Sequence, residues 1–190
     1  MKIVGVGCGP GMLTGEAASA IAAASLVYGS ARAIALARDA IPPDSEVHEI
    51  ADYRSLCSLP DHAVVLSTGD PMLAGLGYLP GEVVPGISSL QVASARLKVP
   101  LARVVVVSAH GKDHGRAIAS AREEVARGKV VFLIADPAFE VGVLAAALPP
   151  ETRLAVCEDL GYPAERIAVG TAAQPPVPRG GLYVVVAGEF

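Results

Sequence analysis

The sequence has 190 residues, a formal net charge of −4 and 4% aromatic residues, which argues against a basic, ring-lined nucleic-acid surface. Hydrophobic residues make up 52% of the chain, but no tract of about 18 consecutive apolar residues occurs, so no membrane span is expected. Its three cysteines, Cys8, Cys57 and Cys157, lie far apart, which disfavours a disulfide framework or a zinc ribbon and favours the reducing cytoplasm. A strand is predicted from residue 2 onward, so no signal peptide is expected.

Short valine-rich runs alternate along the chain with alanine-rich helical stretches. Strands are predicted at residues 2–6, 25–28, 46–50, 63–67, 82–84, 103–108, 129–134, 153–157, 166–169 and 182–187. Helices are predicted at residues 12–24, 31–40, 89–97, 114–127 and 138–148. Apolar strands separated by helices are typical of a mainly parallel sheet covered on both faces. The last three strands lack helices between them, so the sequence predicts two α/β domains, 1–99 with a mainly parallel sheet and 100–190 with a mixed one.

The first predicted strand runs into the glycine-rich turn VGVGCGPGMLTG at residues 4–15. A dinucleotide-binding loop needs the spacing G-x-G-x-x-G at a strand-to-helix turn. Counted from Gly5 the third glycine falls on Pro10, and counted from Gly7 it falls on Met12. Pro10 also lacks the backbone N–H that a pyrophosphate requires. The turn is therefore not the usual NAD loop.

Two further turns follow predicted strands and carry polar side chains. Asp70 comes directly after the strand that ends in VVLST, where open α/β sheets bind ligands. Its carboxylate either accepts hydrogen bonds from a ligand or caps a helix that has Pro71 at its first position. Ser88 and Ser89 begin the next helix, where hydroxyl and N–H groups suit a carboxylate ligand or an ordinary cap.

Titratable residues in the second half support less specific interpretations. His110 and His114 have metal-ligand spacing for a helix, but two glycines make that segment a poor helix, so loop histidines are the simpler interpretation. Glu158 and Asp159 either orient a ligand or form a turn. No metal site is predicted.

Taken in order, the turns Gly9–Gly11, Gly69–Pro71 and Pro85–Ser89 resemble the tetrapyrrole methylase family over nearly the whole chain. The resemblance implies two α/β domains that hold S-adenosyl-L-methionine in the cleft between them, and usually a homodimer. The positions that match the family's cofactor contacts are Pro10, Thr68, Gly69, Asp70, Leu73, Ser88, Ser89, Ile134 and Ala135.

Segments 106–116 and 156–167 are similar to the cobalamin-pathway members that methylate C5 of precorrin-7 or cobalt-precorrin-7. This similarity implies a tetrapyrrole substrate and a separate C15-methylating decarboxylase as a partner. The alternatives are methylation of another precorrin carbon, a diphthine synthase, or an inactive homologue that serves as a binding scaffold. Diphthine synthases typically follow the G-D-P turn with an alanine-threonine-threonine-histidine run, whereas this chain has Met72 and then Leu73-Ala74-Gly75.

The predicted chemistry needs no covalent residue, because the sulfonium cofactor carries an activated methyl group and the protein supplies orientation. No catalytic residue is therefore named. A substrate with many carboxylates needs cationic or hydrogen-bonding partners, for which the candidates are His110, Lys112, Arg116 and Arg32. Only Gly77–Gly81 separates the G-D-P segment from the next strand, where relatives carry a longer helix, so one wall of the predicted cleft is shortened.

Overall fold

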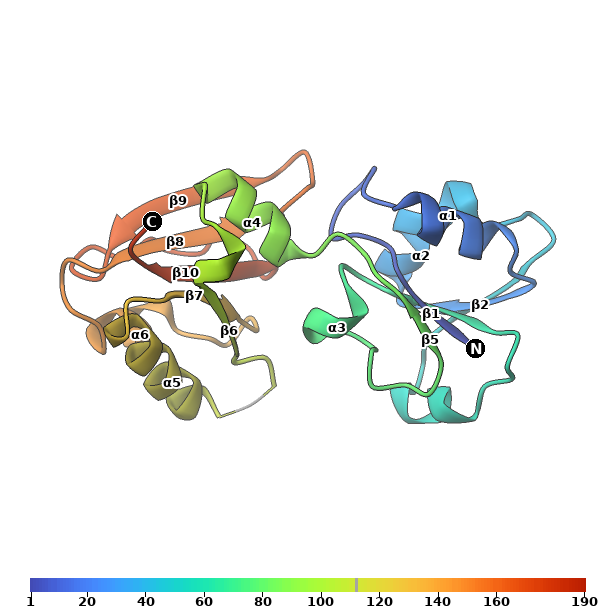
Figure 1. Cartoon of the computed structure of the whole chain (residues 1–190), viewed down its shortest axis with the longest axis horizontal. Coiled ribbons are helices and arrows are strands. Elements are labelled where there is room, and N and C mark those ends of the chain that lie inside the picture. Colours follow the sequence, from blue (N-terminus) through green and yellow to red (C-terminus); the bar gives the residue numbers. More distant parts are fainter. Residues whose placement is uncertain (112) are drawn as a thin grey trace. The chain divides into compact units, whose positions relative to one another are not determined.

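The computed structural model describes residues 1–111 and 113–190. The chain divides into two compact units, Met1–Ser89 and Leu90–Phe190, and Figure 1 shows the elements of each. The sequence predicted the join between the domains at residues 99–100, further along the chain than this division. Because the first unit ends at Ser89, helix α4 (Ser89–Leu97) belongs almost entirely to the second unit. No helix among the described residues has the length and apolar character needed to cross a membrane.

The first unit is built on a five-stranded sheet in which every pairing is parallel. Its strand order is β3-β2-β4-β1-β5. The strands are β1 (Lys2–Gly5), β2 (Leu26–Gly29), β3 (Glu46–Glu49), β4 (Val64–Ser67) and β5 (Glu82–Val84). The helices are α1 (Gly15–Ala22), α2 (Ala31–Ala37) and α3 (Pro71–Ala74), with 3₁₀ turns at Arg38–Ala40 and Tyr53–Ser58.

Alternating side chains of the central strands fill two separate cores in this unit. Val4 packs with Ile21 of α1 on one face of the sheet, while the neighbouring Ile3 packs with Leu56 of a 3₁₀ turn on the other. Successive side chains of a strand point to opposite faces, so a strand that is covered on both sides reads as a continuous apolar run. This is the pattern from which the parallel sheet was predicted.

The second unit holds a mixed five-stranded sheet of order β6-β7-β10-β8-β9. Its strands are β6 (Val104–Ser108), β7 (Val130–Ile134), β8 (Arg153–Glu158), β9 (Arg166–Thr171) and β10 (Tyr183–Gly188). Only β6 and β7 pair in parallel among these described strands. Besides α4 the unit has α5 (His114–Ala126), α6 (Val141–Ala146) and a 3₁₀ turn at Leu101–Arg103. The predicted fold class, with one parallel and one mixed sheet, is confirmed.

Two helices begin later than the sequence predicted. Helix α1 begins at Gly15, since the Thr14 hydroxyl accepts a hydrogen bond from the Ala17 N–H (3.1 Å). Helix α6 begins at Val141 and not at residue 138, because the chain first makes a turn in which the Asp136 carboxylate accepts from the Ala138 N–H (2.9 Å). The N-cap residue of α6, Glu140, makes no side-chain cap bond. The Thr14 contact satisfies a donor that a helix leaves unpaired at its start.

Candidate functional sites at the carboxyl ends of the strands

Three loops of the first unit meet where β1, β4 and β5 end. Gly7 and Gly69 exchange backbone hydrogen bonds, with N···O distances of 2.8 and 3.3 Å. The Cys8 N–H donates to the Ile87 carbonyl across 3.0 Å. The carboxyl edge of a parallel sheet is where α/β proteins bind ligands, and here the backbone itself joins the three loops.

Glycine is required at this edge because main chains touch each other directly. A Cβ atom on Gly86 would lie 2.2 Å from the Gly69 carbonyl oxygen, and one on Gly5 would lie 2.6 Å from the Gly86 nitrogen. No side chain fits at such distances. Packing between loops thus explains Gly5, which the sequence analysis considered as the first glycine of a pyrophosphate-binding loop. This contact joins residues far apart in the chain and was not predicted, although its three glycines, Gly5, Gly69 and Gly86, all lie in the three turns described above.

Asp70 ties two of these loops together with its carboxylate. Its Oδ1 accepts from the Met72 N–H (2.8 Å), so it is the N-cap of α3 with Pro71 at the first helical position. Its Oδ2 accepts from the Gly86 N–H (3.0 Å). A carboxylate has about four lone-pair sites, so these two bonds leave acceptor capacity for a ligand. Asp70 is therefore a structural cap, and its predicted cofactor role remains a prediction.

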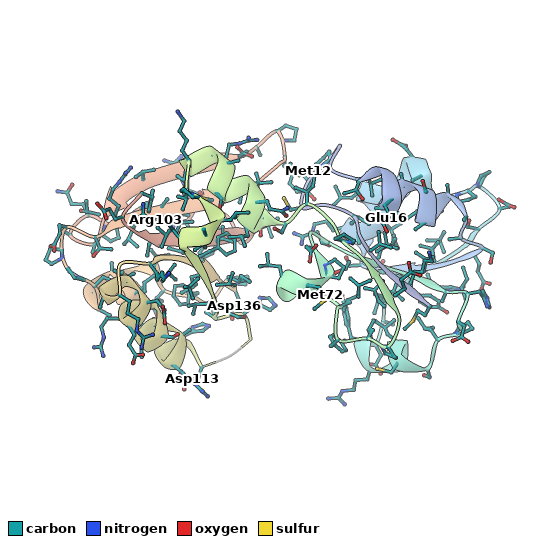
Figure 2. The ribbon with its side chains drawn as sticks, viewed as in Figure 1. Met12, Glu16, Met72, Arg103, Asp113 and Asp136 are labelled. Carbon is teal, nitrogen blue, oxygen red and sulfur yellow. The ribbon has the colours of Figure 1, made fainter. Side chains whose placement is uncertain are left out.

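The other predicted cofactor positions of the first unit surround the same turns. Pro10 is exposed at the tip of the first loop, Thr68 and Leu73 are half-buried, Ser88 is 4% exposed, and Ser89 begins α4. Met72 projects from α3 with 69% of its surface exposed (Figure 2).

Space and donor chemistry at this edge fit a nucleoside cofactor. A Cβ on Gly11, which has φ of +72°, would meet no atom within 4 Å, and one on Gly69 would find only the Ser88 Cα, at 3.9 Å. The turns therefore leave room above their backbone. The Thr68 hydroxyl and the Asp70 carboxylate are groups of the kind that ribose hydroxyls and an amino group bond.

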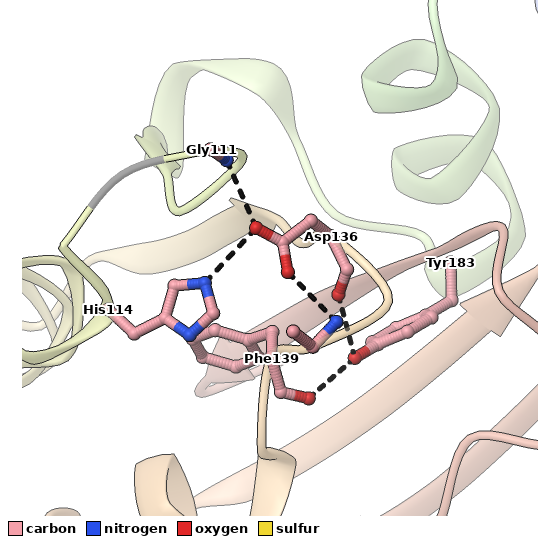
Figure 3. A network of polar contacts seen from close by, with 6 residues as sticks. Gly111, His114, Asp136, Phe139 and Tyr183 are labelled. Atoms are coloured by element: carbon pink, nitrogen blue, oxygen red, sulfur yellow. Dashed lines mark hydrogen bonds and ion pairs between the residues drawn. The ribbon is translucent and has the colours of Figure 1, made fainter.

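In the second unit, Asp136 occupies a position like that of Asp70. Both aspartates follow a parallel strand and precede a proline. The Asp136 Oδ1 accepts from the Ala138 N–H (2.9 Å), and Oδ2 accepts from the Gly111 N–H (3.0 Å), which lies in the loop after β6 (Figure 3). In each unit, then, one carboxylate caps its own turn and holds a glycine N–H of a neighbouring loop.

Around Asp136 the contacts extend to three ring side chains. The His114 Nε2 lies 3.1 Å from the Asp136 Oδ2, and the His114 ring meets Phe139 edge to face, with 5.3 Å between centroids. The Tyr183 hydroxyl donates to the Phe139 carbonyl (2.7 Å) (Figure 3). The Gly111 N–H and then the His114 ring hold the pKa of Asp136 below its ordinary value, so this group is a carboxylate near neutral pH.

Glu158 and Asp159, for which ligand and turn roles were both considered, have structural contacts. Glu158 is 3% exposed and accepts from the backbone N–H groups of Arg179 and Gly180, at 2.6 and 2.7 Å, and it pairs with Arg166. Burial acts to raise the pKa of Glu158, but these donors outweigh it and lower the pKa. Asp159 has φ of +47° and its N–H donates to Leu182, as expected for a turn.

The remaining predicted residues are distributed between the units. Ile134 ends β7 and Ala135 follows it, and both are half-buried. His110 is exposed in the loop after β6, Arg116 is exposed on α5, and Arg32 is exposed on α2 of the first unit. Lys112 lies outside the described residues. In the part of the chain that the structure describes, no three ligand-type side chains gather as a metal site would require.

The family model of the Tetrapyrrole (Corrin/Porphyrin) Methylases matches residues 2–176. The chain belongs to the tetrapyrrole methylase family. Membership confirms the predicted family and its class of enzyme and cofactor, a methyltransferase that uses S-adenosyl-L-methionine.

Several proteins resemble this methylase. A curated protein of Methanocaldococcus jannaschii, named "Probable cobalt-precorrin-7 C(5)-methyltransferase", is 32% identical over an alignment of 131 residues. The match covers 58% of this chain and 61% of that protein. The crystal structure of the cobalamin biosynthesis precorrin-6Y methylase from Archaeoglobus fulgidus matches 100% of this chain and 97% of its own, with 30% identity and a TM-score of 0.79. A uroporphyrin-III C-methyltransferase from Thermus thermophilus, complexed with S-adenosyl homocysteine, shares the fold at 20% identity, with 98% and 91% coverage and a TM-score of 0.70.

Proposed function

We propose that this methylase transfers the methyl group of S-adenosyl-L-methionine to C5 of precorrin-7 or cobalt-precorrin-7 in cobalamin biosynthesis. The observation that carries the proposal is the 32% identity to the curated protein named for that reaction. The whole-chain likeness to a precorrin-6Y methylase supports the pathway. Segments 106–116 and 156–167, which resemble the same group of enzymes, support the C5 position.

The proposed cofactor residues are those that the family resemblance identified. Thr68, Gly69, Asp70, Ser88 and Ser89, with Pro10 and Leu73, would hold the nucleoside and amino-acid parts from the first unit, and Ile134 and Ala135 would contribute from the second. When bound, the cofactor supplies an electrophilic methyl group next to a positive sulfur. The remaining task of the protein is orientation, which can lower a barrier by about 7–11 kcal/mol when the reacting atoms are well placed.

Exposed cations are proposed for the substrate side. Arg32 and Arg116 are exposed, and a guanidinium binds a carboxylate through two parallel hydrogen bonds. His110 and Lys112 complete the proposed set. The acceptor is an electron-rich ring carbon of the macrocycle, so no nucleophilic side chain is assigned.

Two measurements test the function. Calorimetry with S-adenosyl-L-homocysteine and with NADH is expected to show binding of the first and none of the second. Incubation with cobalt-precorrin-7 and methyl-labelled cofactor is expected to give a product labelled at C5. Label at another carbon would move the chain to a different precorrin methylase. Cofactor binding with no turnover on any precorrin would favour a scaffold, and NADH binding alone would refute the assignment.

The association of this methylase with other chains is also a proposal. We expect a homodimer, and contact with a C15-methylating decarboxylase that acts on the same macrocycle. Sedimentation of the purified chain, alone and with such a decarboxylase, measures both. A boundary at the mass of one chain would refute the homodimer. An unchanged boundary for the methylase in the mixture would refute its contact with the decarboxylase.

A further inference from the structure

Asp136 makes more contacts than its own turn requires. A strand-to-helix turn of this kind needs one bond from the carboxylate to the N–H two residues on, and the Ala138 N–H supplies it. The bonds to Gly111 and His114 reach residues that lie 25 and 22 positions earlier in the sequence. They therefore join the loop after β6 to the loop after β7.

The two loops joined in this way carry proposed functional residues on both sides. Ile134 and Ala135, proposed to contact the methyl donor, directly precede Asp136. His110, proposed to contact the tetrapyrrole, directly precedes Gly111, whose N–H is bonded to Asp136. The strands β6 and β7 are parallel neighbours, with Ser108 paired to Ile134, so both loops leave the same edge of the sheet.

We propose that Asp136 is a positioning residue for methyl transfer, whose carboxylate fixes the His110 loop relative to the methyl-donor segment Ile134–Ala135. The inference rests on the proposed function. His114 acts with it, because its ring is held between the Asp136 carboxylate and Phe139. The Tyr183 hydroxyl braces the second loop through the Phe139 carbonyl, so the carboxylate works from a fixed support.

Replacement of one oxygen of the Asp136 carboxylate separates its hydrogen bond within the turn from its hydrogen bond to the loop after β6. An asparagine at 136 keeps the turn, since its carbonyl can accept from the Ala138 N–H. Its NH₂ group then faces the Gly111 N–H, where two donors meet. Asp136→Asn is therefore expected to release the His110 loop while leaving β7 and Ala135 in place.

The experiment compares four variants with the wild type at a temperature where all are folded. Asp136→Asn is expected to lower kcat/KM for cobalt-precorrin-7 by about tenfold or more, because small misplacements of reacting groups cost up to about 10²-fold. Its affinity for S-adenosyl-L-homocysteine is expected to stay near the wild-type value, while amide exchange at Gly111 becomes faster. His114→Ala, which keeps the Gly111 bond, is expected to show a smaller loss of the same kind.

Two controls separate positioning from stability. Asp113→Asn changes another carboxylate of the same segment that caps α5 through the Arg116 N–H (3.3 Å), and asparagine caps equally well, so its kinetics should match the wild type. Leu154 lies at the start of β8 in the core of the same unit. Leu154→Ala therefore destabilises the unit without changing a contact of Asp136. An equal loss of kcat/KM in Leu154→Ala and Asp136→Asn, or unchanged kinetics in Asp136→Asn, would overturn the inference alone. A wild type that neither binds S-adenosyl-L-homocysteine nor methylates a precorrin would overturn the proposed function and this inference with it.

Discussion

Asp70→Asn tests whether the carboxylate at the end of β4 supports the site by joining loops. In the wild type its two oxygens accept from the backbone N–H groups of Met72 and Gly86, at 2.8 and 3.0 Å. Asparagine retains one acceptor and caps helices well, so the bond to Met72 survives. The NH₂ group replaces the other acceptor and faces the Gly86 N–H. Leaving this N–H without its charged acceptor is expected to lower the free energy of unfolding by about 1–3 kcal/mol.

A matched control exists in the same unit. Asp52 caps the 3₁₀ turn Tyr53–Ser58 by accepting from the Arg54 N–H (2.9 Å), the same two-residue spacing as in Asp70. Asp52→Asn preserves that bond and is expected to cost a few tenths of a kcal/mol. The difference between the two variants therefore isolates the bond to Gly86.

The assay is thermal unfolding together with cofactor calorimetry on the same preparations. In a chain of this size each kcal/mol shifts Tm by about 2–4 °C, so Asp70→Asn should melt several degrees below Asp52→Asn. If Asp70 also contacts the cofactor, its affinity for S-adenosyl-L-homocysteine should fall about tenfold, as loss of a charged hydrogen bond predicts. Equal Tm values for the two variants would refute the loop-joining role, and unchanged affinity would remove Asp70 from the proposed cofactor residues.

Three further variants or measurements address other parts of the chain. Gly86→Ala should lower the free energy of unfolding by about 3 kcal/mol in urea titrations, since its Cβ would lie 2.2 Å from a backbone oxygen and overpacking costs about 1–3 kcal/mol; a variant as stable as the wild type would contradict this. The Arg96 side chain, together with the Gly161 N–H, holds the pKa of Glu165 below its ordinary value. The Glu165 carboxylate therefore stabilises the folded state above about pH 4.3, and this stabilisation is lost as the pH falls through the lowered pKa. The difference in Tm between wild type and Glu165→Gln should therefore be largest near neutral pH and shrink on acidification, and a difference independent of pH would show that the charge contributes nothing. Burial raises the pKa of the Cys157 thiol to about 12. Iodoacetamide at neutral pH should therefore label exposed Cys57 in the native protein and leave Cys157 unlabelled until the protein unfolds. Labelling of Cys157 in the native protein as fast as Cys57 would contradict this expectation.

Strand positions were predictable because they depend on local composition. A run such as Val64–Leu66 is apolar throughout because both faces of β4 are buried, and that property is visible in three consecutive letters. Helix starts were less predictable. They depend on which side chain satisfies the first N–H groups. Here Thr14 caps α1, so the helix begins at Gly15 and not at residue 12.

Contacts between loops were beyond the sequence analysis because they join residues far apart in the chain. Nothing near Gly86 in the sequence indicates that its nitrogen meets the Asp70 carboxylate. Asp136 was overlooked for the same reason, although a signal existed. The pair Asp136-Pro137 follows β7 as Asp70-Pro71 follows β4, and a repeated aspartate-proline pair after buried strands marks both carboxylates.

The place of β10 in the second sheet has a consequence for synthesis on the ribosome. This strand lies between β7 and β8, pairing with both, yet it is the last strand of the sheet to be translated. The first unit has all five of its strands once Val84 has left the exit tunnel. Domains generally fold in the order in which they emerge, so the first unit can form while the second still exposes the edges of β7 and β8. A nascent chain that stalls before Tyr183 therefore presents unpaired strands, and rescue by chaperones during translation would act on this unit.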